Sequence, residues 1–336
     1  MNNSAEPFFL TRGVILLPHD IVTGNWLELA RASHLTTIAT HIRPAEIMDF
    51  MRTAEGRGFL DACKASGIQV EHELHAIGEL LPRELFAKNP SMFRMNDAGQ
   101  RTPDTNLCVH SKEALEVVCE HALAVAQALR PTTGRYFFWI DDGAAMCRCP
   151  ACRTLSDSEQ ALVVENAILK ALRSSDPGAT LAHLAYANTL TPPAQIKPEP
   201  GIFLEFAPIQ RSFQVPLNCQ EPCADDPKRA AHAGLLAALA ANVEVFGCAG
   251  AQVLEYWLDV SLFAGWKREN TIAIPWRQEV FEEDLRTYAS FGIRHVTSFA
   301  CWADGDYMAR FGEPPVGQYG ETLRRFSARG SGQPCA

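Results

Sequence analysis

Eight short stretches of apolar, β-branched or aromatic residues recur along the chain, and between them apolar residues return every three to four positions. A short apolar run is typical of a buried strand, and the longer periodicity is typical of an amphipathic helix. The pattern therefore predicts eight strands, at residues 13–18, 36–42, 68–77, 135–142, 180–188, 202–208, 251–259 and 295–302.

Helices are predicted between these strands, and several begin at Ser or Asp, whose side chains cap the free N–H groups of a first turn. Two end near a glycine, Gly67 or Gly292. Alternating strands and helices indicate a parallel sheet, and eight such units fit a (β/α)8 TIM barrel. A doubly wound sheet would favour a glycine-rich phosphate loop after the first strand, which "LLPHDIVTGNW" does not supply. We predict an α/β fold, with a single barrel domain over residues 1–336 and helices over 44–67, 111–130, 156–175, 226–243 and 277–292.

The connections after the third and fourth predicted strands are long. Residues 78–110 follow the third strand, and residues 143–155 follow the fourth. Long loops in a compact domain are usually functional. Both loops leave the C-terminal ends of their strands, the face on which TIM barrels build active sites, so we expect the site there.

Composition limits the partners of the protein. With 47% hydrophobic residues, the 336-residue chain can bury a large core, and its formal charge of −9 disfavours nucleic acid as a ligand. No apolar run is long enough for a transmembrane helix, and the first residues lack the features of a signal peptide. We expect a cytoplasmic protein with no membrane partner, and a homo-oligomer is compatible with the sequence.

Polar and aromatic residues gather at the predicted C-terminal strand ends. Single residues of this kind usually cap helices or satisfy loops, but here carboxylates converge with aromatic side chains that can stack on sugar rings. The candidate substrate-binding residues are His19, His41, His75, Tyr186, Asn188, Arg211, Tyr256, Trp257 and Trp302.

Two adjacent acids, Asp141 and Asp142, close the fourth strand in "WIDDG". Two carboxyl groups in close proximity do not ionise together easily, so such a pair can supply one protonated acid and one charged partner. Successive side chains of a strand face opposite ways, so both reach one site only if the strand bends, which Gly143 permits. A solvated Asp-Asp-Gly turn is the alternative interpretation.

Three of the eleven cysteines, Cys147, Cys149 and Cys152, form a C-x-C-x-x-C motif. Thiolate zinc sites use such short spacings, and Cys108 at the end of the preceding long loop is the candidate fourth ligand. Four thiolates close a tetrahedral site, so the zinc would be structural. Reduced thiols without metal are the alternative. Cys219 and Cys223 are candidates for a second pair or for an alternative ligand.

Four segments follow one another in a specific order: "HELHAIGELLPRELFAKNPSMFRMNDAGQRTPDTNLC", "WIDDG…CRCPACRTLSDSEQ", "LAYANTLTPP" and "EYWLD". In this order the chain, over residues 10–312, resembles an uncharacterised-domain family of bacterial TIM-barrel proteins. That family groups with the glycoside hydrolases near α-glucuronidases and hexosaminidases, and includes endo-β-N-acetylglucosaminidases. The resemblance implies that Asp142 protonates the leaving glycosidic oxygen while Asp141 holds the 2-acetamido N–H of the substrate. Larger family members carry a signal peptide and an accessory domain, so their absence here favours a smaller intracellular saccharide.

The leading hypothesis is a retaining, substrate-assisted glycosidase acting on an N-acetylhexosaminide. A glycosidase with Glu205 or Glu255 as nucleophile and Asp142 as acid is a variant of it. Two other classes stay open. One is a non-catalytic saccharide-binding barrel with structural zinc. The other is a metal-dependent hydrolase, although "LPHDIV" lacks the His-x-His common on the first strand of such barrels.

Overall fold

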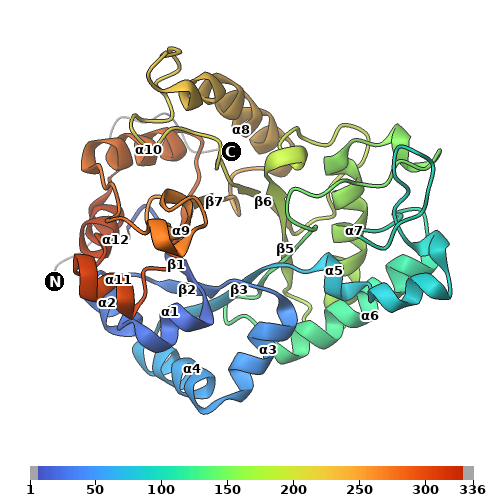
Figure 1. Ribbon diagram of the computed structural model, residues 1–336, viewed down its shortest axis with the longest axis horizontal. Helices are drawn as coiled ribbons and strands as arrows, with labels where there is room; N and C mark the ends of the chain where they lie inside the picture. The colour runs from blue at the N-terminus through green and yellow to red at the C-terminus, as the bar shows by residue number, and fades with distance from the viewer. Residues whose placement is uncertain (1–6, 328–336) are drawn as a thin grey trace.

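The computed structural model describes residues 7–327, and its centre is a closed, all-parallel barrel in which the strands follow one another in chain order (Figure 1). Helices surround the barrel, which confirms the predicted (β/α)8 TIM-barrel fold. The strands are β1 (Thr11–Leu16), β2 (Thr37–Thr40), β3 (Gln69–His75), β4 (Arg135–Trp139), β5 (Thr180–Ala185), β6 (Ile202–Phe206), β7 (Gln252–Glu255) and β8 (His295–Phe299).

Side chains alternate between the two faces of each strand, and this alternation builds two cores. Inward residues such as Ile15, Phe137 and Leu254 fill the barrel, where they are fully or almost fully buried. Outward residues such as Val14 and Val253 pack against the surrounding helices in a larger core. Because both faces are covered, the strands are apolar almost throughout, which explains why they stand out in the sequence.

All eight predicted strands extend two to four residues too far at their C-terminal ends. The prediction for the fourth, for example, ran to residue 142, whereas β4 ends at Trp139. The residues beyond each strand turn into the loops above the barrel. The difference decides which strand-end side chains reach a common pocket.

The predicted helical segments are largely confirmed, but one of them is divided, and six of the twelve α-helices in residues 7–327 were not predicted. The segment 44–67 divides into two helices at Thr53, whose side chain accepts the N–H of Gly56 and so caps the second one. Residues 18–32 form two helices that were not predicted. The helices are α1 (Pro18–Thr23), α2 (Trp26–Ala32), α3 (Pro44–Arg52), α4 (Ala54–Ser66), α5 (Ile77–Leu80), α6 (Lys112–Ala128), α7 (Asp157–Leu172), α8 (His232–Phe246), α9 (Val260–Phe263), α10 (Gln278–Ser290), α11 (Gly305–Phe311) and α12 (Val316–Arg325).

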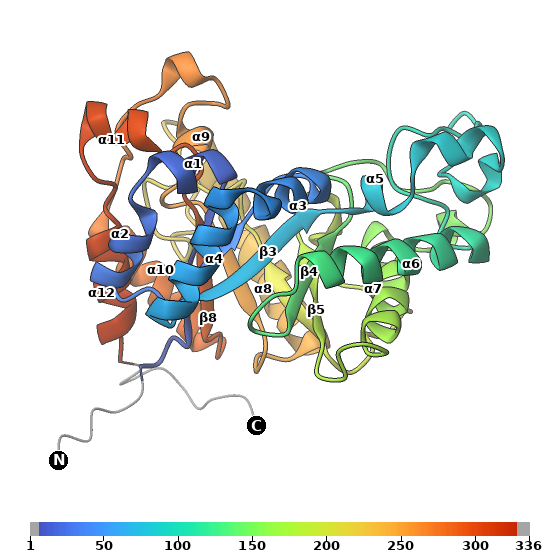
Figure 2. The ribbon, with the colours of Figure 1, turned by 90° about the horizontal axis from the view of Figure 1, so that it is seen from below.

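Two long connections leave the C-terminal ends of β3 and β4, as predicted. We call residues 76–111 loop 3 and residues 140–156 loop 4. Loop 3 contains α5 and two short 3-10 helices, η1 (Arg83–Ala87) and η2 (Pro90–Met92). Figure 2 shows the segment between β3 and α6 extending sideways beyond the barrel. Among residues 7–327, no helix combines the length and apolar character that crossing a bilayer requires.

Candidate active site

A pocket of about 270 Å³ opens among the C-terminal strand ends, and we call it the barrel-mouth pocket. Its volume is near the lower limit for small-molecule sites, which suits one small ring better than a long chain. Six of the sequence-predicted residues line it together: His41, His75, Asp142, Tyr186, Tyr256 and Trp302. The lining also includes residues that sequence reasoning did not select, among them Trp139, Asp259, Trp266 and Phe299.

Asp142 is the exposed carboxylate of the pocket. It lies in loop 4, three residues beyond β4, and 66% of its side chain is accessible to solvent. Its Oδ1 is 3.7 Å from Nε2 of His75. Tyr186 faces it as well. Burial, followed by the negative charge of Asp142 and a hydrogen bond with it, raises the pKa of the Tyr186 phenol. Asp142 therefore lies beside two polar side chains, His75 and Tyr186.

A hydrogen bond to the backbone determines which ring nitrogen of His75 carries a hydrogen. Its Nδ1 is 2.6 Å from the carbonyl oxygen of Ile140, which can only accept, so Nδ1 carries a hydrogen. In the neutral ring Nε2 is then an acceptor facing Asp142. His41 is held in the same way, with Nδ1 2.7 Å from the Glu73 carbonyl oxygen, and burial lowers its pKa to about 4. His41 is therefore neutral at physiological pH.

Asp259 is the buried carboxylate of the pocket, and 5% of it is exposed. It follows β7 and caps the first turn of α9: its Oδ1 accepts the Ser261 N–H at 3.0 Å and the Ser261 hydroxyl at 2.6 Å. Burial raises its pKa to about 6. Its place at the end of the seventh strand was visible in the sequence, but an N-cap aspartate alone gives no sign that it faces a pocket.

Two tryptophans of the pocket have left-handed backbones, Trp266 with φ 56° and Trp302 with φ 68°. Bulky residues rarely adopt this conformation, and such strain concentrates at functional sites. The N–H of Trp302 donates to Oδ1 of the buried Asp20 at 3.2 Å, which holds that turn in place. Burial raises the pKa of Asp20 to about 7. Trp266 is 63% exposed at the rim, an uncommon position for the largest side chain.

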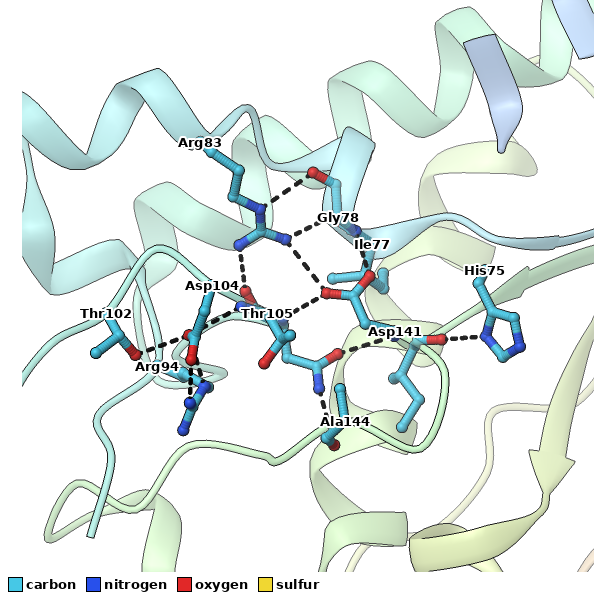
Figure 3. A network of polar contacts seen from close by, with 12 residues as sticks. His75, Ile77, Gly78, Arg83, Arg94, Thr102, Asp104, Thr105, Asp141 and Ala144 are labelled. Carbon is cyan, nitrogen blue, oxygen red and sulfur yellow. Dashed lines mark hydrogen bonds and ion pairs between the residues drawn. The ribbon is translucent and has the colours of Figure 1, made fainter. Parts of the chain in front are cut away.

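The structure turns Asp141 away from the pocket and corrects its predicted role. Its carboxylate accepts the N–H of Gly78 at 2.7 Å and that of Asn106 at 2.6 Å, and lies 3.4 Å from the Arg83 guanidinium. Figure 3 shows it facing these loop 3 groups, with His75 on the opposite side. Because every one of these partners belongs to loop 3, Asp141 fastens loop 4 to loop 3. The two acids do not share one site.

Glu205 lies inside the barrel but below the pocket. It is fully buried, and its carboxylate accepts the indole N–H of Trp139 at 2.8 Å and the amide N–H of Gln252 at 2.9 Å. Burial raises its pKa to about 8. Trp139 lines the pocket and separates Glu205 from it. The structure therefore does not support Glu205 as a nucleophile, and its role is to orient that tryptophan.

Glu255 and Arg211 lie outside the barrel, between β7 and α10. Arg211 is fully buried and pairs with Oε1 of Glu255 and with Oδ2 of Asp284, each at 2.7 Å. The indole N–H of Trp257 donates to the same aspartate at 3.1 Å. These contacts place all three predicted residues, Glu255, Arg211 and Trp257, in a structural ion-pair network behind the strand, so their predicted roles in catalysis and sugar binding are not supported.

His19 and Asn188 also lie outside the pocket lining. The His19 side chain is largely exposed, with Nε2 3.6 Å from Oδ2 of Asp304. The Asn188 amide donates to the Ala144 carbonyl at 3.2 Å and to Asp157 at 2.9 Å, which attaches the start of α7 to loop 4. Both contacts serve the loops around the pocket.

The predicted cysteine cluster assembles away from the pocket. Cys108 of loop 3 meets the three cysteines of loop 4, and the four sulfur atoms lie within 4.8 Å of one another. All four residues, Cys108, Cys147, Cys149 and Cys152, are buried. Cys219 does not join them: its sulfur accepts a hydrogen bond from Arg229 at 3.0 Å.

The sequence of this chain matches a known family of protein domains. Residues 7–232, more than half of the chain, match the family model described as "Domain of unknown function (DUF4838)". The chain belongs to this family. The matched part of this DUF4838 protein contains β1 to β6, loops 3 and 4 and the cysteine cluster, whereas Asp259, Trp266 and Trp302 lie beyond it. No curated protein shows significant sequence similarity to the chain.

Several solved barrels are similar to this DUF4838 protein. A β-N-acetylhexosaminidase from Bacteroides fragilis is similar with a TM-score of 0.54 and 11% identity, over 98% of this chain and 68% of that one. A mutant endo-β-1,4-glucanase from Xanthomonas axonopodis pv. citri has a TM-score of 0.51 and 9% identity, over 94% and 100%. A fungal β-1,4-galactanase has a TM-score of 0.50 and 13% identity, over 95% and 100%. At these identities the similarity shows a common fold.

The raised pKa of Asp259 makes a prediction for stability. Between pH 4 and pH 6 its carboxyl is protonated in the folded protein and ionised in the unfolded chain, so raising the pH disfavours folding until the folded pKa is passed. The difference from an ordinary aspartate is worth up to about 3 kcal/mol. Asp259→Asn keeps the acceptor for Ser261 without the charge. The free energy of unfolding of the wild type, measured with urea relative to this variant, should fall by that amount between pH 4 and pH 6. Parallel pH profiles would show that Asp259 is not buried as described.

Proposed function

We propose that this protein is a glycoside hydrolase that acts on a small saccharide in the barrel-mouth pocket. One observation carries the proposal: two carboxylates, Asp142 and Asp259, enter the same small pocket, whose walls are largely aromatic. Glycosidases need two carboxyl groups, one to protonate the leaving oxygen and one to act from the other face of the sugar ring. Aromatic walls suit the apolar faces of sugars.

Asp142 is assigned the role of general acid. It is exposed at the mouth of the pocket, where a leaving group would depart into solvent. His75, with its acceptor Nε2 toward Asp142, can share one proton with it. The 3.7 Å separation is long for a hydrogen bond, but such contacts commonly shorten when substrate excludes water.

Asp259 is assigned the role of second carboxylate. The bonds from Ser261 hold its Oδ1 in a fixed direction. Its pKa of about 6 means that it is ionised above that pH, as a nucleophile or base must be. Activity is therefore expected to rise between pH 5 and pH 7. The configuration of the first sugar released, followed by NMR, decides whether Asp259 attacks the anomeric carbon directly or activates a water molecule.

The arrangement does not favour the acetamido-assisted route that the sequence suggested. That route assigned Asp141 to hold the acetamido N–H, and its carboxylate is bound to loop 3 instead. The proposal therefore rests on two separate carboxylates and leaves the 2-substituent of the sugar open.

The test is turnover of a panel of aryl glycosides, including N-acetylhexosaminides, hexuronides and unsubstituted hexosides. The wild type is expected to hydrolyse at least one of them, and Asp259→Asn to lose most of that activity. Asp306→Asn, which removes an exposed acid on α11, is the matched control and should retain it. If sugars bind but no glycoside is turned over, and Asp142→Asn leaves the affinity unchanged, the barrel is a saccharide-binding protein instead.

Trp266 provides a separate prediction about substrate binding. Its ring lies at the rim of the pocket and is mostly exposed, so truncating it removes a stacking surface and little packing. Trp266→Ala should raise KM about fivefold, since an aromatic contact contributes roughly 1 kcal/mol, while the melting temperature hardly changes. Trp276→Ala, which removes a tryptophan that packs on Phe281 outside the pocket, should show the reverse pattern. An unchanged KM for Trp266→Ala would remove this residue from the site.

A further inference from the structure

We propose that Cys108, Cys147, Cys149 and Cys152 bind one Zn²⁺ ion, which joins loop 3 to loop 4 and holds the segment that carries Asp142. The cluster lies outside the barrel-mouth pocket, and the proposed hydrolysis makes no use of it. The metal site stands on its own geometry. Its effect on Asp142 rests on the proposed function.

The distances between the four sulfur atoms match those of a metal ion with tetrahedral coordination. Cys108 Sγ is 3.8 Å from the sulfurs of both Cys149 and Cys152, and the four atoms lie within 4.8 Å of one another. Four sulfurs at about 2.3 Å from one zinc ion stand about 3.8 Å apart along each edge of the tetrahedron. A disulfide would need about 2.0 Å, and the four residues are free cysteines. Sulfur ligands in this geometry select zinc or iron, and a site of four thiolates has no open position for water.

The groups around the sulfurs suit negative charge. The N–H of Met95 donates to Cys147 Sγ at 3.3 Å, and the Arg101 guanidinium approaches the same sulfur at 3.7 Å. Nδ1 of His110 is 3.3 Å from Cys152 Sγ. Four thiolates and one Zn²⁺ leave a net charge of −2, which these donors and the arginine offset. Reduced thiols packed as small apolar side chains would not need such neighbours.

A buried glutamine holds two of the loop 4 cysteines, Cys147 and Cys152, through their backbone groups. Gln160 on α7 is fully buried, accepts the N–H of Cys147 at 3.1 Å, and donates to the carbonyl oxygens of Cys147 and Cys152 at 3.2 and 3.3 Å. Gln160 therefore attaches Cys147 and Cys152 to α7, and Cys149 lies between them in loop 4, while the fourth ligand, Cys108, comes from loop 3. Ligation would complete the site by bringing the two loops together.

The cysteine cluster lies close in sequence to the hydrogen bonds that position Asp142. Asn106, two residues before Cys108, exchanges two hydrogen bonds with Asp141: its N–H donates to Oδ2 at 2.6 Å, and its side-chain oxygen accepts the Asp141 N–H at 3.0 Å. Asp142 is the next residue, and Cys147 follows five positions later. The ion and the Asn106–Asp141 pair thus join the loops on both sides of Asp142.

The direct test is elemental analysis of the untagged protein purified without added metal, together with Co²⁺ exchange. We expect one Zn²⁺ per chain, and a visible spectrum typical of a tetrahedral cobalt thiolate after exchange. Cys108→Ser and Cys149→Ser should lose the metal, whereas Cys119→Ser on α6 is the matched control and should keep it. The Co²⁺ spectrum of the wild type provides the result if the serine variants fail to fold.

Hydrogen exchange tests the effect on the loops, and it needs no substrate. In Cys108→Ser, or after zinc removal by a chelator, amides of residues 104–111 and 140–155 should exchange faster, while those of β1 and β2 do not change. A wild type without zinc, iron in its place, or zinc retained in both serine variants would overturn the metal site. Zinc present with unchanged exchange in these loops would overturn its positioning role. Neither result depends on hydrolysis, so failure of the proposed function is recognised separately.

Discussion

Asp142→Asn is expected to lower kcat/KM for a phenyl glycoside by a factor of 10² to 10⁴, the range that a positioned general acid contributes. Asparagine keeps the size of the side chain and cannot donate a proton to the leaving oxygen. Because the side chain is 66% exposed, the free energy of unfolding should change by less than about 0.5 kcal/mol. Steady-state kinetics and urea unfolding of the same preparation separate the two effects.

Two variants serve as controls for Asp142→Asn. Asp306→Asn removes an exposed charge elsewhere and should leave kcat/KM unchanged. Asp141→Asn should weaken the attachment of loop 4 through Gly78 and Asn106, so any loss of activity should come with faster hydrogen exchange in both loops. Full activity in Asp142→Asn would exclude this residue as the acid.

The second large effect is expected on stability. Arg211→Met should lower the free energy of unfolding by about 3 to 5 kcal/mol, because it leaves two buried carboxylates without their cation. Both partners, Glu255 and Asp284, are fully buried, and burial raises the pKa of Glu255 to about 7. The measurement is urea unfolding at pH 8, where the unpaired charges are most costly.

A matched exposed arginine distinguishes this effect from loss of charge alone. Arg286 pairs with Glu282 and Glu283 on the surface of α10, and Arg286→Met should cost less than about 1 kcal/mol. Adding Glu255→Gln and Asp284→Asn to Arg211→Met should recover part of the lost stability. Loss of activity in Arg211→Met without loss of stability would instead return Arg211 to substrate binding.

The fold was predictable because its signals are local. Parallel strands covered on both faces are apolar runs such as that of β4, and the intervening helices have their own periodicity and caps, as at Ser156 and Ser111. The division at Thr53 was missed because one side-chain cap interrupts an otherwise continuous helical pattern. Helices α1 and α2 are short, and a six- or seven-residue helix gives little periodicity to detect.

The site was predictable only in part, because strand ends are uncertain by a few residues and neighbouring side chains face opposite ways. Glu205 and Glu255 both lie near the C-terminal ends of β6 and β7, yet one points into the barrel below the pocket and the other points out toward α10. Asp141 and Asp142 diverge because the N–H groups of Gly78 and Asn106 capture the first carboxylate. These are donors of another loop, and no pattern in loop 4 reveals them.

The cysteine cluster, in contrast, could be predicted from the sequence. The close spacing of Cys147, Cys149 and Cys152 limits how far apart their sulfurs can lie, and the end of loop 3 was the place from which a fourth ligand could come. Cys108 does lie within reach of the other three. Trp302 was predicted from its place near the end of the eighth strand, but Trp266 was not. The left-handed backbones of both could not be predicted, since they depend on contacts such as that of Trp302 with Asp20, which is 282 residues away in the chain.

The dependence of the Asp142→Asn defect on the leaving group tests the central claim most directly. A general acid matters most when the departing oxygen is basic, and it matters little when the departing phenol is already acidic. Measured as kcat/KM over a series from dinitrophenyl to phenyl glycosides, the variant should be nearly as active as the wild type on the first and 10² to 10⁴ times slower on the last. An equal deficit across the series would contradict the assignment of Asp142 as the group that protonates the glycosidic oxygen.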